Sequence, residues 1–524
     1  MKGLLFALIS LASFSHLLAQ PTIGLIQSTP TAFDGYTLFS PEKNENVYLI
    51  NNCGEKVNTW IFSERPGLTC YLLEDGNLLR AGKDSLEIRD WDNNLIWSYS
   101  VAQLGNQHHD IEPLPNGNIL LVMADNYSNA AIIAEGRDPS VTNTNFKLDR
   151  IIELEPTTPG NANVVWEWKF FDHLVQEFDN TRPNFGDVST SPELLDLNYY
   201  DAESNQDYTH VNSIDYDADL DHILISARHL NEIYIIDHST TTQEAAGHTG
   251  ENSGKGGDFL WRWGNPHVYQ SGTPGDQKIG QQHDAKFIKS GPFQGMISCF
   301  SNEAFGFDPF SSSVHIIQPD ETGGIYAMSG MSFLPFDNYW SWTGTLNGDP
   351  LFGDFKCGFQ VLDDGHMIIT ETEKGKASEI DSTGNLHWQY IVPHGSSLMN
   401  QFDTPIENEI FRAERYAGSY VGLNGQDLSG NGIIENVNDS SAACVTLGVD
   451  EMSMSLKVYP NPTSNWIHIF SDYQIISIEL LDMKGQLVSS SKEPEMDLSE
   501  LSQGLYQIRI NTEQGIIVKM LVKE

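Results

Sequence analysis

Short apolar runs separated by polar, turn-forming residues recur along most of this chain, and none of them shows the period of an amphipathic helix. Asp-Gly or Asn-Gly stands between two such runs at residues 75–76, 116–117 and 364–365. A glycine in this place supplies the positive φ that a tight hairpin turn requires. The pattern therefore predicts antiparallel strands joined by short turns.

The apolar runs group into an imperfect repeat of four strands, and the last strand of each copy carries tryptophan. The repeat occurs about six times, which predicts an all-β, six-bladed β-propeller with the tryptophan strand outermost in each blade. Inserts at residues 125–148 and 240–258 are expected to be loops on its faces. The tryptophans that mark the copies are, in chain order, Trp60, Trp97, Trp166, Trp261, Trp340 and Trp388.

Both ends of the chain depart from this repeat. Residues 1–20 combine Lys2, an apolar run and a small-residue exit, as in a secretory signal peptide, and no later apolar run is long enough to span a membrane. The propeller is expected over residues 21–392, followed by an irregular tail and linker over 393–450. Within that tail, residues 427–432 are interpreted as an Asx turn rather than a calcium loop. A small all-β unit is expected over residues 451–524.

The net charge of −42 and the pI near 4.5 exclude nucleic acid as a partner, because that ligand needs a basic surface. A site for an anionic substrate would need local positive charge to overcome the electrostatic field of this net negative charge. Arg228, at the end of a predicted strand over residues 222–227, therefore becomes a candidate site residue.

Five cysteines are few for an exported chain. Cys53 and Cys70 are close enough in sequence to form a disulfide bond. Cys299, Cys357 and Cys444 are expected to be buried thiols rather than metal ligands, because none shows the Cys-x-x-Cys spacing.

Three histidine positions, rather than a familiar catalytic motif, carry the candidate chemistry. The chain lacks G-x-S-x-G, a P-loop, H-E-x-x-H and the C/S-x-P-x-R sequence of sulfatases. Instead, His109, His210 and His283 each stand at the entry to the innermost strand of a different predicted blade. Innermost strands line the channel of a propeller, so these imidazoles are expected to converge at its mouth, beside Asn212 and Arg228.

The segments that carry these residues resemble the bacterial arylsulfate sulfotransferases, which are PAPS-independent six-bladed propellers. The resemblance covers residues ~21–440 and rests on HHDIEPLPNGNILL, DYTHVNSIDYD followed by ILISARHLNEIYIID, QQHDAKF and GFQVLDDGHMIITE. It implies transfer of a sulfuryl group from a phenolic sulfate donor to a phenol acceptor, by ping-pong chemistry through a sulfated histidine.

The resemblance also assigns roles to individual residues. It implies that His283 is the nucleophile, that His210 and Asn212 are the family's H-x-N pair, and that Arg228 binds sulfate. His109 is favoured over His108 for the remaining histidine position, because an aspartate follows it directly, as one follows His283.

Elementary chemistry supports the same roles. Sulfuryl transfer spreads negative charge over the equatorial oxygens of the transferred group. The planar guanidinium of Arg228 can bind two of these oxygens. A neutral His283 attacks sulfur directly, so no metal or cofactor is required. His109 or His210, when protonated, would neutralise the departing phenolate and then deprotonate the incoming phenol.

Other polar and aromatic residues have weaker claims. Thr370, in the last inner hairpin, is a further candidate to touch substrate, although filling its strand is the simpler role. Aromatic side chains at 336, 340 and 342 are candidates to hold a phenyl ring, although packing between blades is the simpler role for the tryptophans. Several histidines at strand ends are expected only to form hydrogen bonds: His222, His229, His238, His315 and His387.

The last ~70 residues resemble the C-terminal sorting domain of the type IX secretion system. The resemblance rests on YPNPTSN, on a Gly-Leu-Tyr strand at 504–506 and on the terminal strand with its lysines. It implies passage through the outer membrane, with the secretion machinery as partner, and a secreted or cell-surface product.

Two other functions remain open. A secreted propeller that binds or adheres without catalysis would have the same fold but no reason to keep the whole His/Asn/Arg set. The same histidines would also serve as metal ligands if Asp110 or Asp284 completed the site.

Overall fold

The computed structural model describes residues 21–141, 145–199, 206–250, 252–304, 311–436, 457–459, 463–471, 474–481, 487–499, 501–512 and 515–523. The expected signal peptide and Cys444 lie outside the described residues. The protein is all-β, and it divides into two compact units, Met1–Cys444 and Val445–Glu524. Among the described residues, no helix is long and apolar enough to cross a membrane.

Within the described part of the first unit, the strands form six antiparallel sheets of four or five strands. Three of them are β33 (Ile410–Ala417), β2 (Gly35–Pro41), β3 (Asn46–Ile50) and β4 (Lys56–Ile61); β5 (Pro66–Leu72), β6 (Leu78–Gly82), β7 (Ser85–Arg89) and β8 (Leu95–Ser100); and β9 (Asn106–Pro113), β10 (Ile119–Ser128), β11 (Asn145–Pro156) and β12 (Ala162–Lys169). The other three are β15 (Val211–Asp217), β16 (His222–Ala227), β17 (Glu232–Asp237) and β18 (Trp261–Trp263); β19 (His283–Phe287), β20 (Ile297–Ser301), β21 (Ser313–Ile317) and β26 (Trp340–Trp342); and β29 (Gly358–Val361), β30 (Met367–Glu371), β31 (Lys376–Ile380), β32 (Leu386–Ile391) and β1 (Gly24–Ser28).

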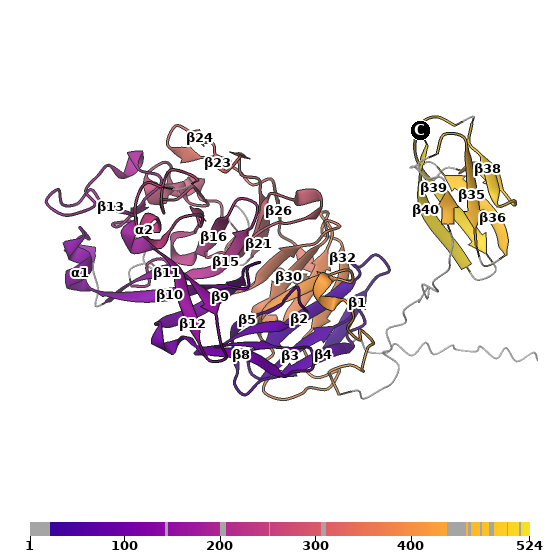
Figure 1. Cartoon of the computed structure of the whole chain (residues 1–524), viewed down its shortest axis with the longest axis horizontal. Coiled ribbons are helices and arrows are strands. Elements are labelled where there is room, and N and C mark those ends of the chain that lie inside the picture. Colours follow the sequence, from indigo (N-terminus) through magenta and orange to yellow (C-terminus); the bar gives the residue numbers. More distant parts are fainter. Residues whose placement is uncertain are drawn as a thin grey trace, which may run out of the picture. The chain divides into compact units, whose positions relative to one another are not determined.

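Smaller elements lie in the connections between these strands. They are α1 (Asn129–Ala134), β13 (Leu174–Val175), β14 (Leu195–Asp196), α2 (Thr242–Ala245), β22 (Glu321–Thr322), β23 (Ile325–Tyr326), β24 (Met328–Ser329), β25 (Ser332–Phe333), β27 (Thr345–Leu346) and β28 (Asp349–Pro350). Figure 1 shows that α1 and β13 lie on the same side of the first unit as the third and fourth sheets.

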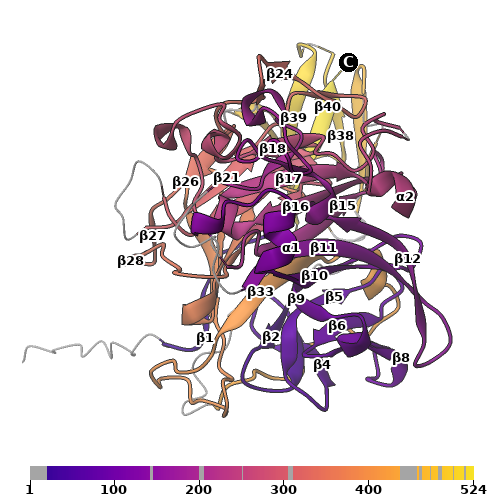
Figure 2. The same cartoon turned by 90° about the vertical axis from the view of Figure 1, so that its left-hand side faces the viewer.

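The first strands of the six sheets lie next to one another in chain order, from β5 through β9, β15 and β19 to β29. The strand β33 completes the series, because it contacts both β29 and β5. Although β33 comes from the end of the first unit, it pairs with β2 from its beginning (Figure 2). Residues 410–417 therefore form a regular strand inside the segment that the sequence analysis expected to be irregular.

Tryptophans of the fourth strands link each sheet to the next. In every sheet an indole N–H donates a hydrogen bond to the turn between the third and fourth strands of the following sheet, and the last sheet donates back to the first. The pairs are Trp60 with Asp90, Trp97 with Asn161, Trp166 with Thr240, Trp261 with Leu334, Trp340 with Ser382, and Trp388 with Asn52. The tryptophan strand is the edge strand in five of these sheets, as predicted, whereas in the last sheet β1 pairs with β32 and lies outside it.

Local features of the structure agree with the expectations drawn from the sequence, except at one pair of cysteines. The hairpin glycines Gly76, Gly117 and Gly365 have φ of 83°, 87° and 90°, as their turns require. The backbone N–H of residue 429 donates to the Asp427 carboxylate, as an Asx turn predicts.

The bond that the sequence allows between Cys53 and Cys70 does not form: Cys70 is a free, buried thiol on β5, whereas Cys53 is disulfide-bonded. Proximity in sequence does not bring the two together, because they lie on different sheets. Cys299 and Cys357 are buried free thiols, as expected.

The described part of the second unit contains two antiparallel sheets around one apolar core. One sheet consists of β34 (Lys457–Tyr459), β35 (Trp466–Phe470) and β38 (Glu495–Asp497). The other consists of β37 (Leu487–Ser491), β36 (Ile475–Leu481), β39 (Gly504–Thr512) and β40 (Gly515–Lys523). Buried residues from both sheets, such as Ile467 and Ile508, belong to the same core cluster.

Candidate functional site

Irregularities in three first strands place the candidate histidines. His108 and His109 lie in β9, His210 directly precedes β15, and His283 is the first residue of β19. His109 and His210 have φ of 55° and 48°, which is uncommon for residues other than glycine. Strand pairing shifts beside each of these positions, so bulges direct the side chains away from the regular ladder.

The histidines of neighbouring sheets meet at this end of the strands. The ring centroids of His109 and His210 are 4.8 Å apart, and those of His210 and His229 are 4.5 Å apart. His108 Nδ1 lies 2.7 Å from His109 Nδ1, while His108 Nε2 lies 2.9 Å from Asp149 Oδ1. His108 is thus tied to a buried carboxylate, whereas His109 and His210 face each other.

The surroundings of His283 fix its tautomer. Its Nδ1 lies 2.7 Å from Asn302 Oδ1 and 3.0 Å from the Gln281 carbonyl oxygen, and both are acceptors. Asn302 is oriented by its Nδ2, which donates to the carbonyl oxygens of Gly353 and Lys356. The proton of neutral His283 therefore lies on Nδ1. Its Nε2 keeps a lone pair, which accepts a 3.2 Å hydrogen bond from the backbone N–H of Lys356.

Burial and nearby positive charge keep two histidines neutral. Burial lowers the pKa of His283 well below its usual value, and the Arg228 guanidinium lowers it further, although the hydrogen bond to Asn302 opposes this shift. Burial also lowers the pKa of His109, with further lowering by His108 and His210. Both imidazoles are therefore available as unprotonated bases at neutral pH.

Arg228 is held between two neighbours at the edge of this cluster. Its Nη1 lies 2.7 Å from His229 Nε2, and its Nη2 donates to Gln281 Oε1. On the other side, Asp207 Oδ2 lies 2.8 Å from His210 Nδ1. Burial alone would raise the pKa of Asp207, but the hydrogen bond from His210 lowers it to about 2. Asp207 is therefore a carboxylate, and its contact with Nδ1 orients the His210 ring.

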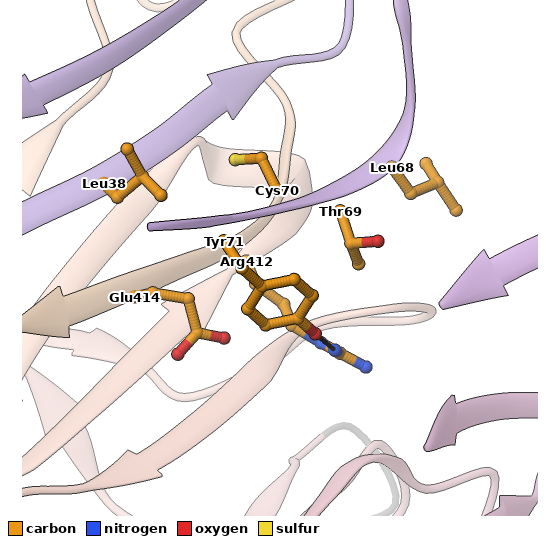
Figure 3. Close-up of a pocket in the computed structure, with 7 residues that line it drawn as sticks. All are labelled: Leu38, Leu68, Thr69, Cys70, Tyr71, Arg412 and Glu414. Atoms are coloured by element: carbon orange, nitrogen blue, oxygen red, sulfur yellow. Dashed lines mark hydrogen bonds between the residues drawn. The ribbon is translucent and has the colours of Figure 1, made fainter. Parts of the chain in front are cut away.

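Arg412 on β33 connects the strands that carry the histidines. Its Nη1 donates to Asp110 Oδ2 at 2.7 Å, and its Nε lies 2.8 Å from Asp284 Oδ1. Its Nη2 donates to the Asn212 carbonyl oxygen at 3.2 Å. Figure 3 shows the guanidinium meeting the Tyr71 hydroxyl beside a small cavity. The aspartates that follow His109 and His283 thus share one buried cation.

Two predicted site residues have buried structural contacts. Asn212 lies on β15, and its Nδ2 donates to the Gln282 carbonyl oxygen at 2.7 Å, which ties β15 to the residue before His283. Thr370 lies on β30, and its hydroxyl accepts a hydrogen bond from the Ala413 N–H on β33. Both side chains are almost fully buried, so each holds strands together.

The aromatic candidates lie away from the first strands, because Trp340 and Trp342 belong to the outer strand β26. Phe336 is exposed on the connection that leads to this strand. The aromatic ring that does reach the histidines is Phe411 on β33, whose centroid is 6.2 Å from that of His109.

Sequence reasoning missed five residues of the site, for different reasons. His229 was set aside as an ordinary hydrogen-bonding histidine, although its place beside Arg228 was a usable signal. Asp207 was also a usable local signal, because it contacts His210 three residues later in the chain. Asn302, Arg412 and Lys356 had no motif, and they join the site only through tertiary contacts.

One set of site residues has the spacing of a metal site. The ligand atoms of Asp207, His210 and His229 lie within 4.8 Å of one another. The carboxylates expected to complete such a site, Asp110 and Asp284, are instead paired with Arg412.

Comparison with known proteins gives two family matches. Residues 72–309 match the family model described as Arylsulfotransferase (ASST), and residues 457–524 match the Secretion system C-terminal sorting domain. A search of curated proteins gave no match.

Similar solved structures include a protein of unknown function from Bacteroides caccae, with 13% identity, a TM-score of 0.37, and coverage of 68% of this chain and 93% of that one. Virginiamycin B lyase from Staphylococcus aureus has 12% identity, a TM-score of 0.31, and coverage of 71% of this chain and 89% of that one. Likenesses at this level say nothing about activity.

The first unit is thus an all-β domain with a cluster of histidines and arginines suited to an anionic group. Its residues 72–309 match the Arylsulfotransferase (ASST) family model, and residues 457–524 of the second unit match the secretion sorting domain. The family supports a sulfotransferase-type function, and the sorting domain indicates export to the cell surface or secretion.

Proposed function

We propose that this protein is an exported, PAPS-independent arylsulfate sulfotransferase that moves a sulfuryl group from a phenolic sulfate to a phenol through a sulfated His283. The observation that carries the proposal is the fixed tautomer of His283, whose Nε2 keeps its lone pair in a site where Arg228 and His210 act electrostatically on the ring. A nucleophilic histidine needs this arrangement, because the attacking nitrogen must be unprotonated.

The scaffold for this site is a six-bladed propeller in our interpretation. The serial contacts between first strands and the circular set of tryptophan hydrogen bonds support it, since both return from the last sheet to the first. The pairing of β33 with β2 would close such a ring. First strands would then line the central channel, with His109, His210 and His283 at its mouth.

In the first half-reaction, His283 Nε2 attacks the sulfur of the aryl sulfate while the bond from sulfur to the phenolic oxygen breaks. The Lys356 N–H, which now donates to Nε2, is released and becomes a donor for a sulfuryl oxygen. Arg228 neutralises charge on the other oxygens. His210, held through Nδ1 by Asp207, protonates the departing phenolate.

In the second half-reaction, a phenol replaces the product in the same position. Neutral His210 or His109 accepts its proton while the phenolic oxygen attacks the sulfur of sulfated His283. The bond between sulfur and Nε2 then breaks, and the imidazole returns to its starting form. The sulfuryl group is transferred without oxidation or reduction. The proposed reaction therefore needs no reactant other than the donor and the acceptor.

Two other functions make different predictions for the same experiment. A binding or adhesion module would keep the fold without any turnover. A metal-dependent enzyme would use Asp207, His210 and His229 as ligands, and chelation would then abolish its activity.

The test is turnover of 4-nitrophenyl sulfate by the purified chain, without PAPS or added metal, with and without phenol. We expect nitrophenolate release that increases with phenol, persists with chelator and disappears in His283→Ala. His387→Ala, on the outer strand β32, is the matched control and is expected to remain active. Donor alone should add the mass of one sulfuryl group to the wild-type chain. Absence of release from the folded protein with any phenol would favour the binding module.

A further inference from the structure

A second histidine–carboxylate cluster involves none of the residues of the transferase site. Asp258 Oδ1 lies 2.8 Å from His173 Nδ1 and 2.7 Å from His248 Nδ1. The three ligand atoms lie within 4.8 Å of one another. His173 follows β12, whereas His248 and Asp258 belong to the insert between β17 and β18. The cluster therefore joins two segments that are far apart in the chain.

The hydrogen-bond roles in this cluster call for a cation. His173 Nε2 lies 2.8 Å from the carbonyl oxygen of Ala245, which can only accept, so Nε2 carries a proton. In neutral His173, Nδ1 would then point a lone pair at the Asp258 carboxylate oxygen. Two acceptors at 2.8 Å need a positive species between them, either a second proton or a metal ion. Histidine ligands of metals commonly donate their other N–H to a backbone carbonyl, as His173 does.

The surrounding residues set the position of the His173 ring. The ring of Trp168 stacks on it, with centroids 5.4 Å apart and planes inclined by 7°, while the Trp168 indole donates to the Gly257 carbonyl oxygen. A Cβ added at Gly257 would lie 2.7 Å from His173 Nε2 and 2.0 Å from the Ala245 carbonyl oxygen. The backbone next to Asp258 thus approaches the ring more closely than a larger residue would permit, which preorganises the cluster.

We propose that His173, His248 and Asp258 bind one divalent transition-metal ion of the zinc type. Two imidazoles and one carboxylate suit zinc, whereas calcium and magnesium prefer oxygen ligands. Ligand atoms about 2.0–2.2 Å from zinc lie roughly 3.3 Å apart in a tetrahedron. Each ring nitrogen would thus move from the Asp258 oxygen by roughly 0.5 Å to admit the ion. The His248 side chain is 58% exposed, so water can take the fourth position.

Such an ion would fasten the insert to the third sheet. The helix α2, which begins this insert, already packs against β12 (Figure 2). Without the ion, the exposed His248 is held to Asp258 by a single charged contact, which contributes little in water. The metal is therefore expected to stabilise the first unit and to leave the transfer chemistry to His283.

The test measures zinc bound by the full mature chain after chelator treatment and dialysis against Zn²⁺. We expect about one ion per chain that is lost in His248→Ala and in Asp258→Asn. Zn²⁺ should also raise the Tm of the wild-type chain but not of the two variants, because only a folded site binds it. His267→Ala, a histidine variant outside both clusters, is the control and should retain the ion and the Tm increase.

Further variants separate this site from the transferase cluster. Zinc that persists in folded His248→Ala and Asp258→Asn but is lost in His229→Gln would overturn the proposal. Failure of the wild-type chain to retain zinc or to gain Tm would do the same. Co²⁺ provides a second measurement, since the strong visible absorption expected of a four- or five-coordinate ion should disappear with His248. A cobalt spectrum unchanged in His248→Ala would contradict the assignment.

Discussion

At the scale of single residues, the site depends on side chains that act through His283. Asn302 accepts from Nδ1 of His283 and is itself fixed by its contacts with Gly353 and Lys356. It thereby keeps the proton on Nδ1 and leaves the lone pair on Nε2. Asn302 is a positioning residue, comparable in logic to the carboxylate that orients a catalytic histidine in a triad.

Asn302→Leu should remove the acceptor that selects the reactive tautomer of His283. We expect kcat/KM for 4-nitrophenyl sulfate to fall by about 10²-fold or more, with a smaller change in KM. Asn302→Asp keeps the acceptor for Nδ1 of His283 but loses the two hydrogen bonds that Nδ2 donates, so it should recover only part of the loss. No recovery at all would contradict the role of the Oδ1 acceptor.

The lowered pKa of His283 predicts an acid-resistant first half-reaction. An ordinary histidine becomes half protonated near pH ~6.5, which would remove the nucleophile. Because burial and Arg228 lower the pKa of His283, its neutral form persists as the pH falls through this range. The single-turnover release of nitrophenolate should therefore decline only well below pH ~6.5. A midpoint at the ordinary histidine value would contradict the assignment of His283 as the buried nucleophile.

At the scale of elements, β33 is the strand that sequence reasoning treated least accurately. Its residues fall within 393–450, which was expected to be an irregular tail and linker. The structure pairs them with β2, more than 300 positions away in the chain. This strand supplies Arg412 and also Phe411 beside His109, so a missed element explains why Arg412 was missed.

Arg412→Met should be costly because it leaves Asp110 and Asp284 buried without their cation. Breaking a buried ion pair in this way typically costs about 3–5 kcal/mol. We expect a loss of this order in the free energy of unfolding, measured by denaturant titration, together with reduced transfer. Arg182→Ala removes an exposed partner of Asp179 and should change stability by less than ~1 kcal/mol. If Arg412→Met left the free energy of unfolding unchanged, the two aspartates would have to find other partners.

At the scale of the whole molecule, the net charge of −42 opposes the approach of an anionic donor. The positive side chains of the site act only at short range, whereas the global field is screened by salt. The Debye length shortens from about 30 Å at 0.01 M to about 8 Å at 0.15 M ionic strength. The rate of association with the donor should therefore depend on salt concentration more strongly than the rate of the chemical step does.

We expect kcat/KM for an aryl sulfate to rise severalfold between about 10 mM and about 150 mM salt. The same parameter for a neutral phenol acceptor, measured at saturating donor, should stay nearly constant and serves as the internal control. A kcat/KM for the donor that falls with salt would indicate that local cations, rather than net charge, control the encounter.

The amino-acid sequence determined the features that depend on nearby residues. Alternating apolar runs, glycine turns and tryptophan spacing identified the strands and the outer position of five of the six tryptophan strands. Local segments also placed His109, His210, His283 and Arg228 at strand ends, because strand direction and turn chemistry are local properties.

Only the tertiary structure decided what these residues meet. Arg412 became a site residue through contacts between sheets, and Asn302 through its contact with His283 on the neighbouring strand of the same sheet. Asn212 and Thr370 proved to join strands within the protein. Cys53 and Cys70 were close in sequence yet not bonded to each other. The physical reason is common to all of them: side-chain partners are set by which strands lie side by side, and periodicity along one strand carries no information about its distant neighbours.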